Sequence, residues 1–83
     1  MDDYKKKLIE QIEEHLMNLE KALKNGAYGL IDHSIKEIVK LVNNLYEVSP
    51  EGKLTHHLLK EANRMKKTKN IDRFKELFNQ IKW

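Results

Sequence analysis

The chain contains no cysteine, one proline and three glycines among its 83 residues. The absence of cysteine excludes a disulfide scaffold and a thiolate metal site, and the scarcity of proline and glycine excludes collagen-like and low-complexity chains. No apolar run approaches the ~18 residues that a membrane-spanning helix needs. Because the length is below the roughly 100–150 residues of a typical domain, we expect residues 1–83 to form a single domain.

The first residues, Met1 to Tyr4, are acidic and lack an apolar stretch ahead of a small-residue cleavage site. We therefore expect no signal peptide and a cytoplasmic protein. Apolar residues make up 40% of the chain and charged residues 35%. This balance is typical of a folded helical protein with a heavily solvated surface.

Apolar residues recur at helical spacing in the first half of the chain. Residues 3–24 carry the stripe Ile9, Ile12, Leu16, Leu19 and Leu23, widened by Tyr4, Leu8 and Ala22. Asn25-Gly26 then supplies the residue types that end a helix with a positive φ. A second helix is predicted over residues 27–47, with the stripe Tyr28, Ile31, Ile35, Ile38, Val42 and Leu45. A second apolar flank of this helix consists of Leu30, Val39, Leu41, Tyr46 and Val48. Since Ser34 and Glu37 fit a capping box, that helix could instead begin at Ser34.

Two shorter helices are predicted in the second half. Ser49 as the N-cap and Pro50 at the first helical position indicate a third helix that ends near Lys67. Its stripe is Leu54, Leu58, Ala62 and Met65. A fourth helix is predicted over residues 71–82, capped by Asn70, with the stripe Ile71, Phe74, Phe78 and Ile81.

No strand-like alternation occurs, and the connections between helices are short. We therefore predict an all-α fold, an antiparallel four-helix bundle in up-down-up-down order with a short fourth helix. The first helix should be ~33 Å long and the fourth only ~18 Å. The fourth helix would then leave one end of the bundle uncovered.

We predict that the apolar residues at that end form a docking surface. Leaving them in contact with water costs a free energy of ~25 cal/mol per Å² of apolar area. The surface should be covered by another protein or by a second copy of the chain, unless Tyr4 and Trp83 close it within the monomer. The candidate partner-binding residues are Tyr4, Leu8, Tyr46, Val48, Leu54 and Trp83.

Charge is unevenly distributed along the chain. Residues 1–52 hold seven Lys against ten Asp or Glu, which gives −3, and residues 53–83 hold nine Lys or Arg against three acids, which gives +6. Such asymmetry suggests an acidic partner or head-to-tail self-association, although a Lys-rich helix is also simply soluble.

The candidate phosphate-binding residues, which could contact nucleic acid or lipid headgroups, are Lys60, Arg64, Lys66, Lys67, Lys69 and Arg73. The alternative is a solvated turn that complements the carboxyl end of the third helix.

Catalytic and metal chemistry find little support in the sequence. The Glu-x-x-His signature of carboxylate-bridged di-metal bundles is absent before His15, His33, His56 and His57. Three isolated glycines cannot form a phosphate-cradling loop, and Ser49 is better explained as a helix cap than as a nucleophile. We expect no enzyme, no metal, no cofactor and no small-molecule substrate.

Residues 50–81 combine a Pro-led third helix, a polar junction and an Arg73-Phe74 pair that opens a short fourth helix. In this organisation, and in its lysine content and lack of cysteine, the chain resembles the small cytosolic bacteriocin immunity proteins of Gram-positive bacteria. The resemblance implies a four-helix bundle that protects its producer through protein contacts at the membrane. The chain is shorter than most members, and we carry over no functional residue from the family.

These observations predict a non-catalytic protein-binding or regulatory module that acts through apolar surface. If the partner is a second copy of the chain, the module is a dimer. The rival prediction is a small basic accessory protein that contacts nucleic-acid or membrane phosphates through the junction of the third and fourth helices.

Overall fold

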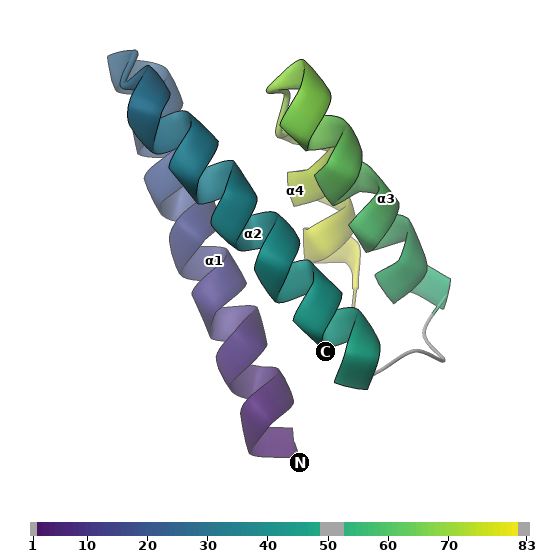
Figure 1. Ribbon diagram of the computed structural model, residues 1–83. Coiled ribbons are helices and arrows are strands. Elements are labelled where there is room, and N and C mark those ends of the chain that lie inside the picture. The colour runs from purple at the N-terminus through teal and green to yellow at the C-terminus, as the bar shows by residue number, and fades with distance from the viewer. Residues whose placement is uncertain (1, 49–52, 82–83) are drawn as a thin grey trace.

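Four α-helices make up the computed structural model, which describes residues 2–48 and 53–81 without the side chains of residues 2, 53 and 54. They are α1 (Asp2–Asn25), α2 (Tyr28–Val48), α3 (Lys53–Thr68) and α4 (Asp72–Gln80) (Figure 1). The predicted all-α four-helix fold is confirmed. The predicted start of the third helix at Ser49-Pro50 lies outside the described residues.

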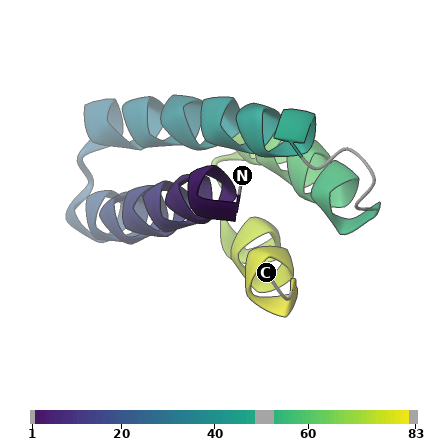
Figure 2. The ribbon, with the colours of Figure 1, turned by 90° about the horizontal axis from the view of Figure 1, so that it is seen from below.

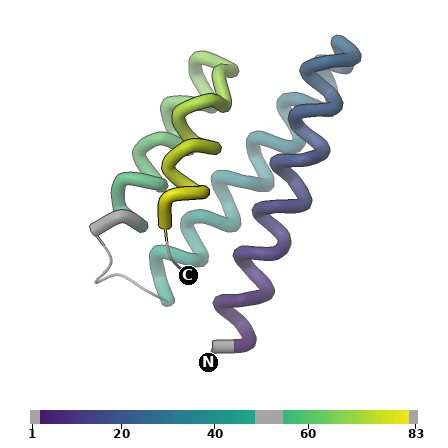
Figure 3. The backbone as a smooth tube through the Cα atoms, turned by 180° about the vertical axis from the view of Figure 1, so that it is seen from behind, coloured from purple at the N-terminus to yellow at the C-terminus, as the bar shows by residue number. Residues whose placement is uncertain are grey.

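Successive helices run in opposite directions, in up-down-up-down order (Figure 1). The most extensive packing is between α1 and α2, followed by that between α2 and α3. The shorter α4 packs on α3, and an ion pair of 2.6 Å between Lys75 Nζ and Glu20 Oε1 links it to α1. Figures 2 and 3 show α1 and α4 on one side of the bundle and α2 and α3 on the other.

Two helices, α1 and α3, are followed by a residue of positive φ. Gly26 has φ +69°, and Ala27 N–H donates to the Ala22 carbonyl at 2.9 Å, which is the Schellman pattern. Lys69 has φ 61°, and its N–H donates to the Met65 carbonyl at 2.8 Å. The predicted stop at Asn25-Gly26 is therefore confirmed, whereas α3 ends on a lysine, for which this conformation is unfavourable.

The second helix begins at Tyr28, so the earlier of the two predicted starts is correct. Ser34 lies well inside the helix and is buried. The stripe that favours the earlier start is only partly confirmed, however. Ile31 continues the buried stripe, but the Tyr28 side chain is 78% exposed.

The predicted stripes form one hydrophobic core. Its most completely buried large side chains come from all four helices: Ile12, Leu19, Ile35, Ile38, Val42, Leu45, Leu58, Met65 and Phe74. Phe74 and Phe78 stack at 6.2 Å between ring centroids and anchor α4 to the bundle. Tyr4 and Leu23, predicted members of the first stripe, are exposed instead.

The fourth helix is shorter than predicted, with nine residues. The N-cap residue of α4 is Ile71, which makes no side-chain cap hydrogen bond, so the predicted capping by Asn70 is wrong. The Asn70 side-chain oxygen instead accepts the backbone N–H of Asp72 at 3.0 Å within the turn before the helix. Figure 3 shows that α4 stops short of the beginning of α1. Within the described residues, no helix combines the length and apolar character that crossing a bilayer requires.

Candidate functional site

The structure separates the predicted docking residues into three groups. Tyr4 and Val48 are exposed at the start of α1 and the end of α2, as the prediction requires. Leu8 is only 3% exposed and belongs to the core, so the prediction that it lines an open surface is wrong. Leu8 and Leu45 both belong to the hydrophobic core.

The other three docking candidates contribute less to an open surface. Tyr46 is partly buried, with its ring 6.0 Å from that of His56 on α3. The side chain of Leu54 and the whole of Trp83 lie outside the described residues. Of the six candidates, Tyr4 and Val48 therefore remain as exposed apolar groups whose position is known.

Exposed apolar side chains nevertheless gather on one half of the molecule. In the described part of the chain, every large hydrophobic residue that is exposed lies on α1 or α2: Tyr4, Met17, Leu23, Tyr28, Leu30 and Val48. The described residues of α3 and α4 contribute none. The α1–α2 hairpin is thus the apolar side of the surface.

A groove of about 370 Å³ follows the junction of α1 and α2 near the Gly26 turn. We call it the seam groove, and its lining is His15, Asn18, Lys21, Ala22, Asn25, Ala27, Leu30, His33 and Ser34. Leu30, 61% exposed, and the two alanines form its apolar part. Among the residues that the structure describes, no carboxylate lines it, so its polar rim carries hydrogen-bond donors, amides and one permanent positive charge.

The seam groove was not predicted from the sequence. Leu30 lies on a predicted apolar flank of the second helix, and His15 and His33 were candidates only for metal binding. The available signal was helical spacing, because His15, Asn18 and Ala22 are three and four residues apart and so share one face of α1.

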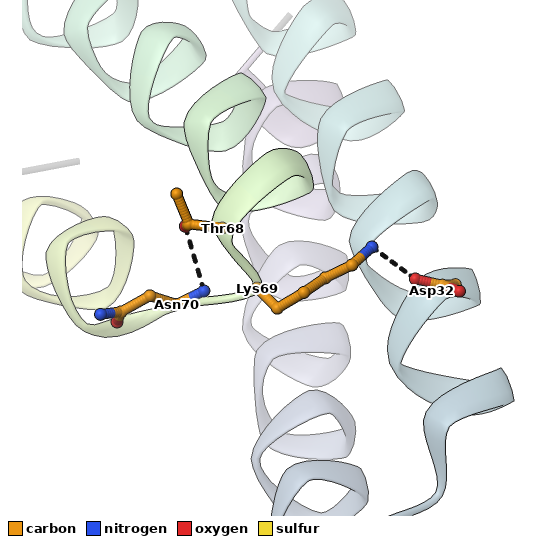
Figure 4. A network of polar contacts seen from close by, with 4 residues as sticks. All are labelled: Asp32, Thr68, Lys69 and Asn70. Carbon is orange, nitrogen blue, oxygen red and sulfur yellow. Dashed lines mark hydrogen bonds and ion pairs between the residues drawn. The ribbon is translucent and has the colours of Figure 1, made fainter.

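The predicted phosphate-binding cluster does not form a single patch. Lys69 points away from the junction of α3 and α4, and its Nζ lies 2.5 Å from Asp32 Oδ1 on α2 (Figure 4). The hydrogen bond and the positive charge of Lys69 lower the pKa of the Asp32 carboxyl below its ordinary value. This lysine is therefore already paired with an acid of the same chain.

Arg73 and two other members of the cluster border a pair of shallow grooves between α3 and α4. One, of about 310 Å³, is lined by His57, Lys60, Arg73 and the acids Glu61 and Glu76, among others. The other, of about 240 Å³, holds Arg64 and Arg73 beside Glu61. Carboxylates therefore interrupt the positive charge at the junction itself.

The histidines do not assemble with acids into a metal centre. Within residues 2–48 and 53–81, no three side chains of the His, Asp or Glu type gather closely enough to hold a metal ion. His56 and His57 lie side by side on α3, with ring centroids 6.2 Å apart.

Comparison with other proteins does not assign the chain to a family. No protein-family model matches the chain, and no curated protein or solved structure is significantly similar to it. The functional argument therefore depends on the two surfaces themselves: the apolar α1–α2 hairpin and the positively charged α3.

Proposed function

We propose that the protein is a non-catalytic binding module that docks another protein on its α1–α2 hairpin. The observation that carries the proposal is the confinement of the described, exposed large hydrophobic side chains to α1 and α2. Exposed apolar surface with a polar rim is typical of protein contacts. Leu30 is the member of this set that lines the seam groove, so the proposed docking surface lies at the junction of the first two helices and not at the end of the bundle.

The seam groove favours an amphipathic helix as the occupant. A groove between two antiparallel helices accepts the apolar side of a third helix, whose residues at i, i+3 and i+4 fill it. Leu30, Ala22 and Ala27 supply the apolar floor. Because the described rim contains Lys21 and two histidines but no acid, carboxylates on the incoming helix would be complementary.

Protein contact is also the mode of action of the immunity proteins that the sequence resembles. A bacterial source and an immunity role are parts of this proposal that depend on the resemblance alone, and the proposed cytoplasmic location depends on the acidic first residues. A second copy of the chain is the competing occupant, and the experiment below distinguishes it from a different protein.

The test is site-specific photo-crosslinking in the cells that produce the protein. A photoreactive residue at position 30 should yield one defined adduct, because Leu30 lies in the seam groove. The matched control is position 43, where Asn43 is exposed on the same helix but does not line the groove. An adduct mass of twice 9.9 kDa would identify a second copy of the chain as the occupant. That result would contradict the proposal that a different protein docks there.

Charge at the groove gives a second readout. A crosslinker placed at Asn18, which also lines the groove, leaves Leu30 free to vary. Leu30→Glu should abolish the Asn18 adduct through repulsion of the partner's carboxylates, whereas Leu30→Lys should retain part of it. Equal adducts at positions 30 and 43, or equal effects of the Glu and Lys variants, would contradict the proposal.

A further inference from the structure

The solvent-facing side of α3 carries hydrogen-bond donors, and one acid of the same helix, the partly buried Glu61, borders them. Six residues spaced three or four apart along this side are all exposed: His56, His57, Lys60, Asn63, Arg64 and Lys67. We call them the α3 stripe. At 1.5 Å per residue the stripe is about 16 Å long.

The positive charges of the α3 stripe are largely unneutralised. Lys60 and Lys67 make no ion pair with any described residue, and Arg64 has only Glu61 Oε1 at 3.6 Å. By contrast, Lys69 and Lys75 are paired with acids on other helices. Two positive charges on this side of α3, those of Lys60 and Lys67, are thus available to a ligand.

We infer that the α3 stripe binds the phosphate backbone of duplex DNA without sequence preference. This binding is separate from the proposed docking of a protein on the hairpin, since the two surfaces share no residue. Phosphates of a duplex present about one charge per 1.7 Å of its axis, which suits a linear array of cations. Of the predicted phosphate-binding residues, the inference keeps Lys60, Arg64 and Lys67. Lys69 is paired with Asp32, and Lys66 and Arg73 are not part of the α3 stripe.

The composition of the α3 stripe favours a duplex over the other polyanions. A helix that lies on a membrane buries an apolar side in it, and the stripe contains no apolar residue. The stripe offers no aromatic side chain other than its histidines to stack on single-stranded bases. The major groove of B-DNA, ~12 Å wide, admits an α-helix, whereas the major groove of duplex RNA is deep and narrow.

Lysine is more abundant than arginine in the stripe, which argues for contact with phosphates over readout of bases. Bidentate contacts to guanine are made most often by arginine, and Arg64 is the one arginine of the stripe. The binding should therefore be weak, electrostatic and strongly dependent on salt.

The test is fluorescence anisotropy of a labelled duplex of about 20 base pairs titrated with the full chain at several salt concentrations. For three phosphate contacts, the affinity should fall about 40-fold between 50 and 200 mM salt, because the slope against log salt is about −0.9 per contact. The triple variant Lys60→Gln, Arg64→Gln, Lys67→Gln should lose most of this slope. A wild-type affinity that does not change with salt would overturn the inference.

A matched control separates the α3 stripe from net charge. The triple variant Lys6→Gln, Lys7→Gln, Lys24→Gln also removes three exposed positive charges, but from α1. It should retain the slope and most of the affinity, and circular dichroism should show that both variants stay helical. Equal losses in the two triple variants would overturn the inference, as would tighter binding to vesicles with anionic headgroups than to the duplex. Leu30→Glu, which tests the hairpin, should leave DNA binding unchanged.

Discussion

The Lys69 ammonium lies 2.5 Å from the Asp32 carboxylate, so the residue that follows α3 also ties its turn to α2. Lys69 makes this contact from a left-handed backbone conformation, φ 61°, beside the hydrogen bond between Thr68 and Asn70 in the same turn (Figure 4). An unfavourable backbone conformation and an exposed ion pair therefore meet in one residue, and substitutions can separate them.

Replacing Lys69 by glycine and by alanine should have different effects. Both variants lose the exposed ion pair with Asp32, so the loss of this contact does not distinguish them. Lys69→Gly also relieves the left-handed strain, so it should be more stable than Lys69→Ala by about 1 kcal/mol. Urea unfolding measures the difference, and equal stabilities would show that φ at this position carries no cost.

The ion pair should also appear in the pH dependence of stability. Lys69 lowers the pKa of the Asp32 carboxyl in the folded chain. The resulting stabilisation is fully present above the unfolded-state pKa of about 3.9 and is lost as the pH falls through the lower folded-state value.

Titration of the Asp32 carboxyl by NMR provides the direct measurement. The wild-type pKa should lie below that of the Lys69→Gln variant, because the variant weakens the hydrogen bond and removes the charge. The stability difference between wild type and Asp32→Asn should shrink on acidification. A pKa unchanged by Lys69→Gln would mean that the pair does not form in solution.

The two described glycines should respond oppositely to alanine. A Cβ at either Gly26 or Gly29 meets nothing within 4 Å, so backbone conformation alone decides the outcome. Gly26→Ala should destabilise by about 1–2 kcal/mol because φ is +69° there. Gly29→Ala, inside α2, should stabilise by about 0.5–1 kcal/mol. Thermal unfolding of both variants checks the signs.

Core substitutions test the predicted stripes. Leu16→Ala and Ile38→Ala should each cost about 2–5 kcal/mol, because both side chains are buried. Tyr28→Ala, at a residue of the second stripe that is 78% exposed, should change stability by less than about 0.5 kcal/mol. Chemical denaturation measures all three, and losses below about 1 kcal/mol at both core positions would contradict the core assignment.

The positions of the helices could be predicted from local patterns. Spacings of three and four residues identify the core side of each helix, and Asn25-Gly26 identifies the first turn, because these signals act over a few neighbouring residues. The left-handed Lys69 had no such signal, since glycine or asparagine is the usual residue at that position.

The candidate surfaces were harder to predict, because exposure depends on how helices pack. Leu8 is a predicted docking residue and lies in the core, while Leu30 and Tyr28 belong to predicted apolar sides and are exposed. On a single helix these side chains look alike. Their burial is decided by the partner helix and by where along its length that partner ends.

The amino-acid sequence by itself determined four amphipathic helices, a short last helix and an excess of positive charge in the second half, because composition and helical periodicity are local properties. Only the tertiary structure decided which cations remain unpaired. Lys69 and Lys75 meet acids that are distant in the chain, whereas Lys60 and Lys67 face solvent. Pairing between distant residues follows from the packing of helices and leaves no periodic pattern in the sequence.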